Sequence, residues 1–271
     1  MTALAAWSAQ LAAWAIPEHI LAAAPESPWV LPRAVFVRRA DRHLRTPAGA
    51  TYDELRKALS PKGTVLDVGA AAGAASLPAG ALIEHVTAVD VNESLLAEFA
   101  ERAGAIPHRL VRGRWPEVAD QVEPVDVVVC AHVLYNAPDL AAFAEALTSR
   151  ARRRVIVETA EVHPLTTLNP LWLRFHGVER PAGPTADDAV AALSELGLDV
   201  EVTRWSKAAA PEYQRFDELV DVTRRRLCLP PEAEGEVADA LRGLGVDART
   251  PPDLGSSGRN VVTLTWAGTA G

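Results

Sequence analysis

The stretch Val65-Leu66-Asp67-Val68-Gly69-Ala70-Ala71-Ala72-Gly73 decides how this chain folds. Its apolar start predicts a buried β-strand, and its two glycines predict a tight turn that leads into a helix. An acidic residue, Asp67, stands two positions before the first glycine. A strand, turn and helix in this order place backbone N–H groups around a small ligand at the carboxyl edge of a parallel sheet.

A second apolar strand, His85-Val86-Thr87-Ala88-Val89-Asp90, also ends in an acid. A carboxylate at the tip of the second strand can accept hydrogen bonds from both ribose hydroxyls of a nucleoside. A dinucleotide fingerprint would need glycine at positions 71 and 74, where this chain has alanine. The two strands therefore predict a nucleoside-containing cofactor, and the glycine spacing argues against a dinucleotide.

The pattern Asp-x-Gly-x-x-x-Gly resembles motif I of the class I S-adenosylmethionine-dependent methyltransferases. The resemblance implies S-adenosyl-L-methionine as cofactor, with its methionine portion wrapped by Gly69 and Gly73. It also implies that Asp67 holds the amino group, directly or through water, and that Asp90 binds the ribose. The family usually has glycine where Ala71 stands, and a methyl group is tolerated there if the local φ is negative. The other cofactor contacts expected are Ala70, Ala71, Val91, Arg114, Trp115, Ala131 and His132.

The stretch Gly113-Arg114-Trp115-Pro116 follows the third predicted strand, where the family often has an Asp for the adenine amino group. A guanidinium cannot accept a hydrogen bond from that amine. Adenine is then held by stacking on Arg114 or Trp115, or by backbone groups. The alternative is that Trp115 packs at the start of a helix whose first residue is Pro116.

Strand and helix alternate regularly from Thr64, which predicts an α/β, Rossmann-like fold. The resemblance implies a seven-stranded sheet of order 3-2-1-4-5-7-6 with strand seven antiparallel. Strands are expected at 64–68, 85–90, 108–112, 126–131, 154–158, 198–205 and 261–266. Helices are expected within 1–24, with a second short one starting at Pro17, and at 50–59, 93–103, 138–150, 185–197, 212–228 and 231–243.

Two helical additions to this sheet are predicted. Residues 1–60 are expected to form an N-terminal helical cap, either on the carboxyl edge or over a face of the sheet, with a proline-broken connector at 25–32. Residues 61–271 are expected to form the methyltransferase domain. Its helical insertion, at about 207–258 between strands six and seven, has the size typical of a lid or a partner surface.

The end of the fourth strand supplies the catalytic candidate, His132. The alternative for this residue is a structural histidine under the adenine. Tyr135 and Asn136 follow it, and we expect them to cap the next helix or, for Tyr135, to face the substrate. The segment 159–184 has no obvious regular structure, as expected of a loop that shapes a pocket. The substrate-pocket candidates are Tyr135, Glu158, His163, Trp172 and His176, which suit a small aromatic or amine-bearing acceptor.

The bulk composition limits the kinds of partner that we expect this chain to bind. The chain has 271 residues, 49% of them hydrophobic and 23% charged, as in soluble globular proteins. A net charge of −8 argues against a broad nucleic-acid surface, so the basic runs at 150–154 and 224–226 are expected to be solvated. No apolar run is long enough to span a membrane. Two dispersed cysteines form no metal-like cluster and are typical of a cytoplasmic protein.

Methyl transfer to a small-molecule acceptor is therefore the favoured function, with a homodimer left open. One alternative is an NAD(P)-dependent dehydrogenase, against which the glycine spacing argues. The other is a non-catalytic, methyltransferase-like binding subunit, in which Ala71 and Arg114 mark a degenerate site and the insertion is the interface.

Overall fold

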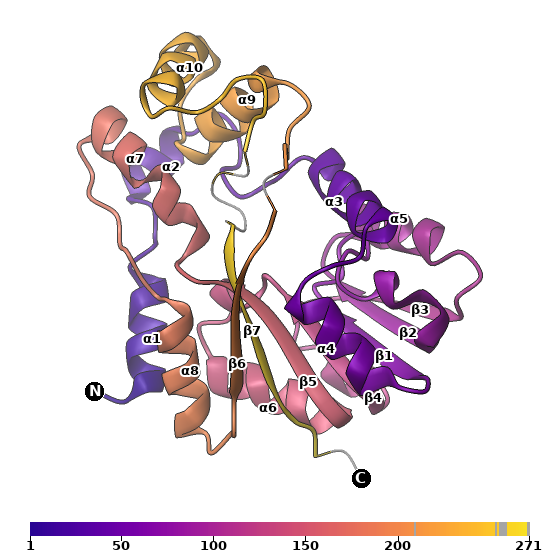
Figure 1. Cartoon of the computed structure of the whole chain (residues 1–271). Coiled ribbons are helices and arrows are strands. Elements are labelled where there is room, and N and C mark those ends of the chain that lie inside the picture. The colour runs from indigo at the N-terminus through magenta and orange to yellow at the C-terminus, as the bar shows by residue number, and fades with distance from the viewer. Residues whose placement is uncertain (209, 253, 255–258, 270–271) are drawn as a thin grey trace.

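The protein folds around one seven-stranded sheet with helices on both faces (Figure 1). The computed structural model describes residues 1–208, 210–252, 254 and 259–269. The observed strand order is β3-β2-β1-β4-β5-β7-β6, which confirms the predicted order. Strand β7 is antiparallel to both of its neighbours, and the other pairs are parallel. The strands are β1 (Gly63–Val68), β2 (Ile83–Asp90), β3 (His108–Arg112), β4 (Val125–Ala131), β5 (Ala151–Ala160), β6 (Glu201–Ser206) and β7 (Asn260–Ala267).

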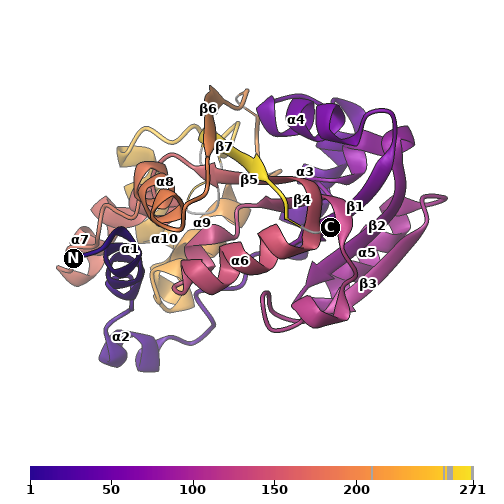
Figure 2. The same cartoon turned by 90° about the horizontal axis from the view of Figure 1, so that it is seen from below.

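Each face of the sheet has its own apolar core. Strand residues that alternate along the buried β4 and β5, such as Val128 and Val127, belong to opposite cores. Helices α1, α6 and α8 cover one face, and α4 and α5 cover the other (Figures 1 and 2). The ten α-helices of the described residues are α1 (Ala3–Ala12), α2 (Glu18–Ala23), α3 (Arg33–Arg45), α4 (Ala50–Leu59), α5 (Glu93–Ala103), α6 (Leu140–Arg150), α7 (Asn169–His176), α8 (Ala186–Glu195), α9 (Phe216–Arg226) and α10 (Glu234–Gly243).

Local capping signals act as the sequence indicates. The Asn92 side chain accepts hydrogen bonds from the N–H groups of Ser94 and Leu95 at the start of α5, and Gly104 ends that helix with a positive φ. Thr185 and Asp188 form a reciprocal capping box at the start of α8. These caps satisfy backbone N–H groups that have no partner inside the helix.

Five local expectations were wrong. The glycine turn after β1 leads into a 3₁₀ segment, Leu77–Leu82, and not into an α-helix. Helix α3 was not predicted, although it begins directly after the proline connector. The segment 159–184 contains a short 3₁₀ turn and α7 rather than irregular loop alone. Asp139, not Tyr135 or Asn136, caps α6. Arg224 is 2% exposed instead of solvated, because its charge is compensated by Glu26 and Asp221.

Helix α3 and the insertion helices lie together beyond the carboxyl edge of the sheet (Figure 1). Arginines of α3 pair with acids that precede or begin α9: Arg38 with Glu218, and Arg39 and Arg42 with Glu212. A third apolar cluster joins α2, α7, α9 and α10. The domain boundary at 60/61 remains a prediction, since segments from both sides of it pack against each other here.

Replacing Thr185 by Ala should lower the free energy of unfolding by about 1 kcal/mol, because the N–H of Asp188 loses its capping acceptor. For a chain of this size the melting temperature should fall by roughly 2–4 °C. Chemical denaturation followed by circular dichroism measures the change. Thr185→Ser keeps the hydroxyl and serves as control; equal losses in both variants would contradict the capping role.

Candidate functional site

The turn after β1 adopts a left-handed backbone at both of its glycines. Gly69 has φ +71° and Gly73 has φ +88°. A Cβ at Gly69 would overlap the side chain of Val133, and one at Gly73 would overlap Leu77. Both positions therefore require glycine, for conformation and for space. The turn is fixed to β2 because the N–H groups of Gly69 and Ala70 both donate to the carbonyl of Val89.

Ala71 also has a positive φ, of +44°. The condition under which a methyl group fits there without strain, a negative φ, is therefore not met. The left-handed conformation costs a non-glycine residue roughly 1–2 kcal/mol. The N–H of Ala71 donates to the Asp90 carboxylate at 2.9 Å, and this bond helps to hold the strained conformation. The backbone thus takes the shape that glycine gives the family loop, at a cost in stability.

The Asp90 carboxylate links the two turns at the tips of β1 and β2. One oxygen accepts from the N–H of Ala71 and the other from the N–H of Asn92, at 2.8 Å. A carboxylate offers roughly four acceptor positions, so about two remain for the hydroxyls of a ribose. The side chains of Val91, Asn92 and Arg112 line an open surface recess next to it. The residues present at this tip therefore fit a nucleoside.

Asp67 lies deeper than the sequence suggests, with no exposed surface. One carboxylate oxygen accepts from the Ser76 hydroxyl at 2.5 Å, and the other is buried with no partner among the described residues. Burial raises the pKa of Asp67 to about 7, and the nearby charge of Asp90 adds to this. The unpaired oxygen can accept a hydrogen bond from an amino group or from a water.

The other predicted cofactor residues lie around this edge with unequal access. Val91 is 55% exposed at the tip of β2, Ala70 is buried under the turn, and Ala131 is half-buried at the end of β4. Arg114 is exposed and faces Glu117. Trp115 is 6% exposed and packs in the core beside Val118, so the packing alternative describes it here. Contact of Arg114 or Trp115 with adenine remains a prediction.

A buried polar cluster forms where β4, β5 and β6 end, and His132 is at its centre. His132 has φ +59°, and its Nε2 lies 2.8 Å from Glu158 Oε1. Its Nδ1 lies 2.7 Å from the Tyr135 hydroxyl. Lys207 Nζ lies 2.6 Å from Glu158 Oε1 and 3.0 Å from His132 Nε2. Thr51 of α4 donates its hydroxyl to the second oxygen of Glu158.

The charges in this cluster fix its protonation. Burial raises the pKa of Glu158, but the charge of Lys207 and the hydrogen bonds from His132 and Lys207 outweigh it and hold that pKa well below its ordinary value. Burial and the charge of Lys207 lower the pKa of His132, against the opposing effect of Glu158. The site therefore contains an ionised carboxylate, a neutral imidazole and a lysine at neutral pH.

The remaining pocket candidates divide into two groups. His163 joins the cluster, because its ring lies 5.7 Å from that of Tyr135 and stacks on Trp14 at 4.0 Å. Trp172 and His176 instead contact each other in α7, and His176 bonds to the carbonyl of Leu227 after α9. The structure thus brings Tyr135, Glu158 and His163 to His132.

Sequence reasoning missed Lys207, Thr51 and Trp14. Lys207 directly follows β6, so the rule that singled out His132 at the end of β4 would have found it. Thr51 lies on α4 and Trp14 in the turn after α1, and the placement of these N-terminal segments over the sheet has no short-range signal. No group of three metal-ligating side chains occurs in the part of the chain that the structure describes. Within the same residues, no helix has the length and apolar character needed to cross a membrane.

Ala71→Gly should raise the free energy of unfolding by up to about 1 kcal/mol, because relief of the left-handed strain exceeds the entropic cost of glycine. Urea denaturation measures it. Ala72→Gly, at a buried position without positive φ, is the matched control and should destabilise. A loss of stability in Ala71→Gly as large as in the control would show that residue 71 is not strained.

Comparison with known proteins finds a family model that matches part of the chain. Residues 65–153 match the family model described as a methyltransferase domain. No curated protein matches the chain. Solved structures of similar fold include magnesium protoporphyrin IX methyltransferase of Synechocystis PCC 6803 with bound SAH, 15% identical over 85% of this chain and 93% of that one, with a TM-score of 0.49. Precorrin-6y C5,15-methyltransferase of Geobacter metallireducens GS-15 is 16% identical over 80% and 87%, with a TM-score of 0.45.

These structural likenesses, with TM-scores of 0.49 and 0.45, carry no argument about this chain. The domain match begins at Val65, inside β1, and extends into β5, so it includes the glycine turn, Asp90 and His132. The strand order of the sheet, with an antiparallel β7, agrees with it. Residues 65–153 therefore resemble a methyltransferase domain, and they lie within a seven-stranded sheet of order β3-β2-β1-β4-β5-β7-β6.

Proposed function

We propose that this protein transfers the methyl group of S-adenosyl-L-methionine to a small molecule held beside His132. One observation carries the proposal: the glycine turn with Asp90, and the neutral imidazole of His132, lie at the same carboxyl edge of the sheet. Val133, directly after His132, fills the space above Gly69, so the two halves of the site touch.

The cofactor supplies an electrophilic methyl carbon on a cationic sulfur. Asp90 would hold its ribose, and the turn from Gly69 to Gly73 would wrap its methionine portion. Asp67 would hold the amino group, directly or through a water. The protein's main contribution to an in-line displacement is alignment and exclusion of water, which is worth several kcal/mol.

His132 is suited to take a proton from the acceptor. A carboxylate only accepts hydrogen bonds, so we assign the Nε2 proton to His132 with Glu158 as its acceptor. Nδ1 is then the basic nitrogen, and it accepts from the Tyr135 hydroxyl. An acceptor hydroxyl or ammonium bound at Tyr135 can pass its proton through that hydroxyl to Nδ1. Glu158 stabilises the imidazolium that results.

A small acceptor is favoured over a macromolecule. The chain carries a net charge of −8, and α3 and the insertion are ion-paired above the carboxyl edge. Trp172 and His176 belong in this proposal to the outer wall of the pocket. A cytoplasmic location and a homodimer remain predictions; both cysteines are buried and unpaired.

Asp90→Ala should weaken binding of S-adenosylhomocysteine at least tenfold, because each hydrogen bond to a charged carboxylate contributes roughly 1.5–3 kcal/mol. Isothermal titration calorimetry measures the dissociation constant, and a melting curve checks that the turn still folds. Glu101→Ala changes an exposed acid in the last part of α5 that does not line this recess, and it is the control. An unchanged dissociation constant in Asp90→Ala would place the ribose elsewhere.

Lys207→Met should raise the pKa of His132, because it removes a positive charge 3.0 Å from Nε2. In the wild type the imidazole should titrate below its ordinary range. Histidine NMR during a pH titration measures both values, with the His132→Asn spectrum assigning the resonance. Lys57→Met, an exposed lysine of α4, should leave the titration unchanged. A His132 pKa that does not respond to Lys207→Met would refute this account of the neutral base.

A further inference from the structure

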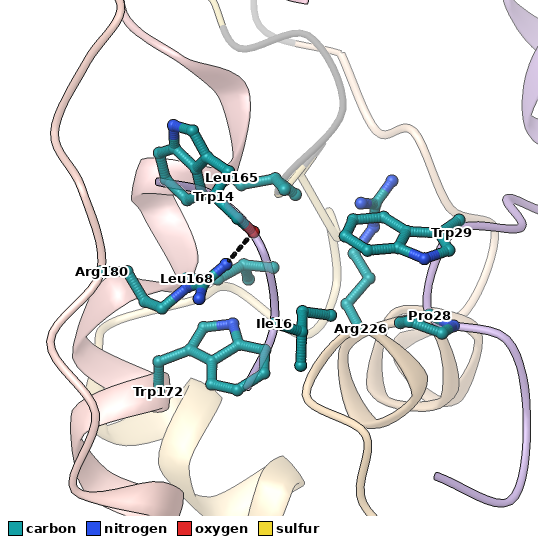
Figure 3. Close-up of a pocket in the computed structure, with 9 residues that line it drawn as sticks. All are labelled: Trp14, Ile16, Pro28, Trp29, Leu165, Leu168, Trp172, Arg180 and Arg226. Carbon is teal, nitrogen blue, oxygen red and sulfur yellow. Dashed lines mark hydrogen bonds between the residues drawn. The ribbon is translucent and has the colours of Figure 1, made fainter. Parts of the chain in front are cut away.

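The two ring nitrogens of His132 face different surroundings. Nδ1 faces the hydroxyl of Tyr135, whose ring contacts His163, and His163 in turn stacks on Trp14. Trp14 borders a small cavity beside α7 (Figure 3). Its volume of about 10 Å³ has room for roughly one water molecule, so this cavity is a packing gap. Nε2 faces Glu158, and the groups that hold this carboxylate determine which nitrogen of the imidazole carries the proton.

Side chains from three adjacent strands and one helix meet around Glu158. In the antiparallel register, Glu158 of β5 lies opposite Thr263 of β7. Trp205 of β6 lies diagonally across from Thr263, within reach of its hydroxyl. Helix α4 contributes Thr51 from its first turn, and Trp205 packs against the start of this helix, where a Cβ at Gly49 would overlap the indole. The sheet register and α4 thus bring an indole, two hydroxyls and a carboxylate into contact.

The hydrogen bonds among these side chains can run in one direction only. An ionised carboxylate only accepts, so the Thr51 hydroxyl uses its proton for Glu158 Oε2, at 2.6 Å. Thr51 must then accept from the Thr263 hydroxyl, at 2.8 Å. An indole only donates, so Thr263 in turn accepts from Trp205 Nε1, at 2.9 Å. Each donor polarises the next one, and the series ends on the negative charge of Glu158.

Both oxygens of Glu158 are held. Oε1 lies 2.6 Å from Lys207 Nζ and 2.8 Å from His132 Nε2. Because Thr51 holds Oε2, the carboxylate cannot rotate without breaking one of these bonds, so Oε1 stays directed at Nε2. Lys207 also lies 5.9 Å from the centre of the Trp205 ring. The end of β6 therefore acts on both oxygens, on one directly and on the other through the two hydroxyls.

We propose that Trp205, Thr263 and Thr51 are positioning residues of the methyl-transfer site. Through them Glu158 is oriented so that the proton of His132 stays on Nε2, which leaves Nδ1 as the base. The inference rests on the proposed function and adds to it three residues that act on His132 through Glu158. Without the Thr51 hydroxyl, the carboxylate can turn away from Nε2, and the imidazole loses the acceptor that fixes its tautomer.

NMR of the whole chain tests the proposal and needs no methyl acceptor. Imidazole ¹H–¹⁵N spectra, assigned with His132→Asn, show which nitrogen carries the proton, and a pH titration gives the pKa of His132. We expect the Nε2–H form in the wild type. Thr51→Val should shift the population toward the Nδ1–H form and lower the pKa of His132, because the Glu158 hydrogen bond that raises this pKa is weakened. Thr51→Ser keeps the hydroxyl and should restore both values.

The direction of the pKa shift separates positioning from a general loss of structure. Loosened packing would admit water to His132 and raise its pKa, because burial is what lowers it most. The other charged groups that act on the ring, Lys207 and Arg39, are the same in all of these variants. A raised or unchanged pKa in Thr51→Val, or an Nδ1–H form in the wild type, would overturn the proposal.

Thr148→Val is the matched control. Thr148 is also buried, and its hydroxyl also accepts from an indole, Trp266 Nε1 at 2.8 Å, but it donates to the carbonyl of Ala144 instead of an acid. This variant should lower the melting temperature and leave the tautomer and the pKa of His132 unchanged. A change at His132 as large as in Thr51→Val would show that any lost threonine hydroxyl has this effect.

Trp205→Phe and Thr263→Val remove the earlier donors and should shift the pKa of His132 in the same direction by less. Should Thr51→Val not fold, these two variants decide, and no shift in either would refute the positioning role. Calorimetric titration of the wild type with S-adenosylhomocysteine separates the two levels. Failure to bind it refutes the proposed function, whereas binding it with the Nδ1–H form of His132 refutes only the positioning role.

Discussion

The buried carboxylate of Glu158 is the constraint on which the candidate site depends. An ionised acid that is 5% exposed needs a compensating charge and hydrogen-bond donors. Lys207 supplies the charge, while His132 and Thr51 supply donors. Because these partners come from β4, α4 and the residue after β6, one carboxylate fixes the sheet's carboxyl edge, a helix that precedes the sheet, and the start of the insertion.

The same interaction sets the chemistry of His132. Lys207 holds Glu158 ionised and also keeps the imidazole neutral, so the pair of opposite charges prepares a base rather than an acid. The strained backbone of His132, with φ +59°, is maintained by its N–H bond to the Glu158 carbonyl at 2.7 Å. A second strained residue, Ala71, is held by the hydrogen bond that its N–H donates to the Asp90 carboxylate. Strain at the two halves of the site is thus offset by hydrogen bonds to acids of the neighbouring strands.

Helices α2, α3, α7, α9 and α10 form a cover beyond this edge of the sheet, and both ion pairs and apolar packing hold it in place. Arginines of α3 pair with Glu212 and Glu218, while α2, α7, α9 and α10 share an apolar cluster. Surface ion pairs contribute little individually, about 0–1 kcal/mol. The apolar cluster is therefore the main stabilising contact of the cover, and the ion pairs determine how α3 is aligned with the insertion.

The sheet could be predicted from sequence because its signals are local. Buried parallel strands are apolar runs in the sequence. The helix caps between them are recognised from a few neighbouring residues, as at Asn92, Gly104 and Thr185. Helix α3 was not predicted, although Val35, Val37 and Leu44 are apolar; in the structure it packs against α5 and forms ion pairs with the insertion. Tyr135 was misjudged as a cap because its partner, His132, is specified only by the turn that joins them.

The sequence alone determined the glycine turn and the acids at the tips of β1 and β2, because each of these depends on residues close together in the chain. It determined the strand order only through its resemblance to a known family. Only the tertiary structure decided that Asp67 is covered, that Ala71 is left-handed and that Lys207 meets Glu158. The physical reason is that burial and charge compensation depend on partners brought together from distant parts of the chain, and hydrophobic periodicity does not encode which partners meet.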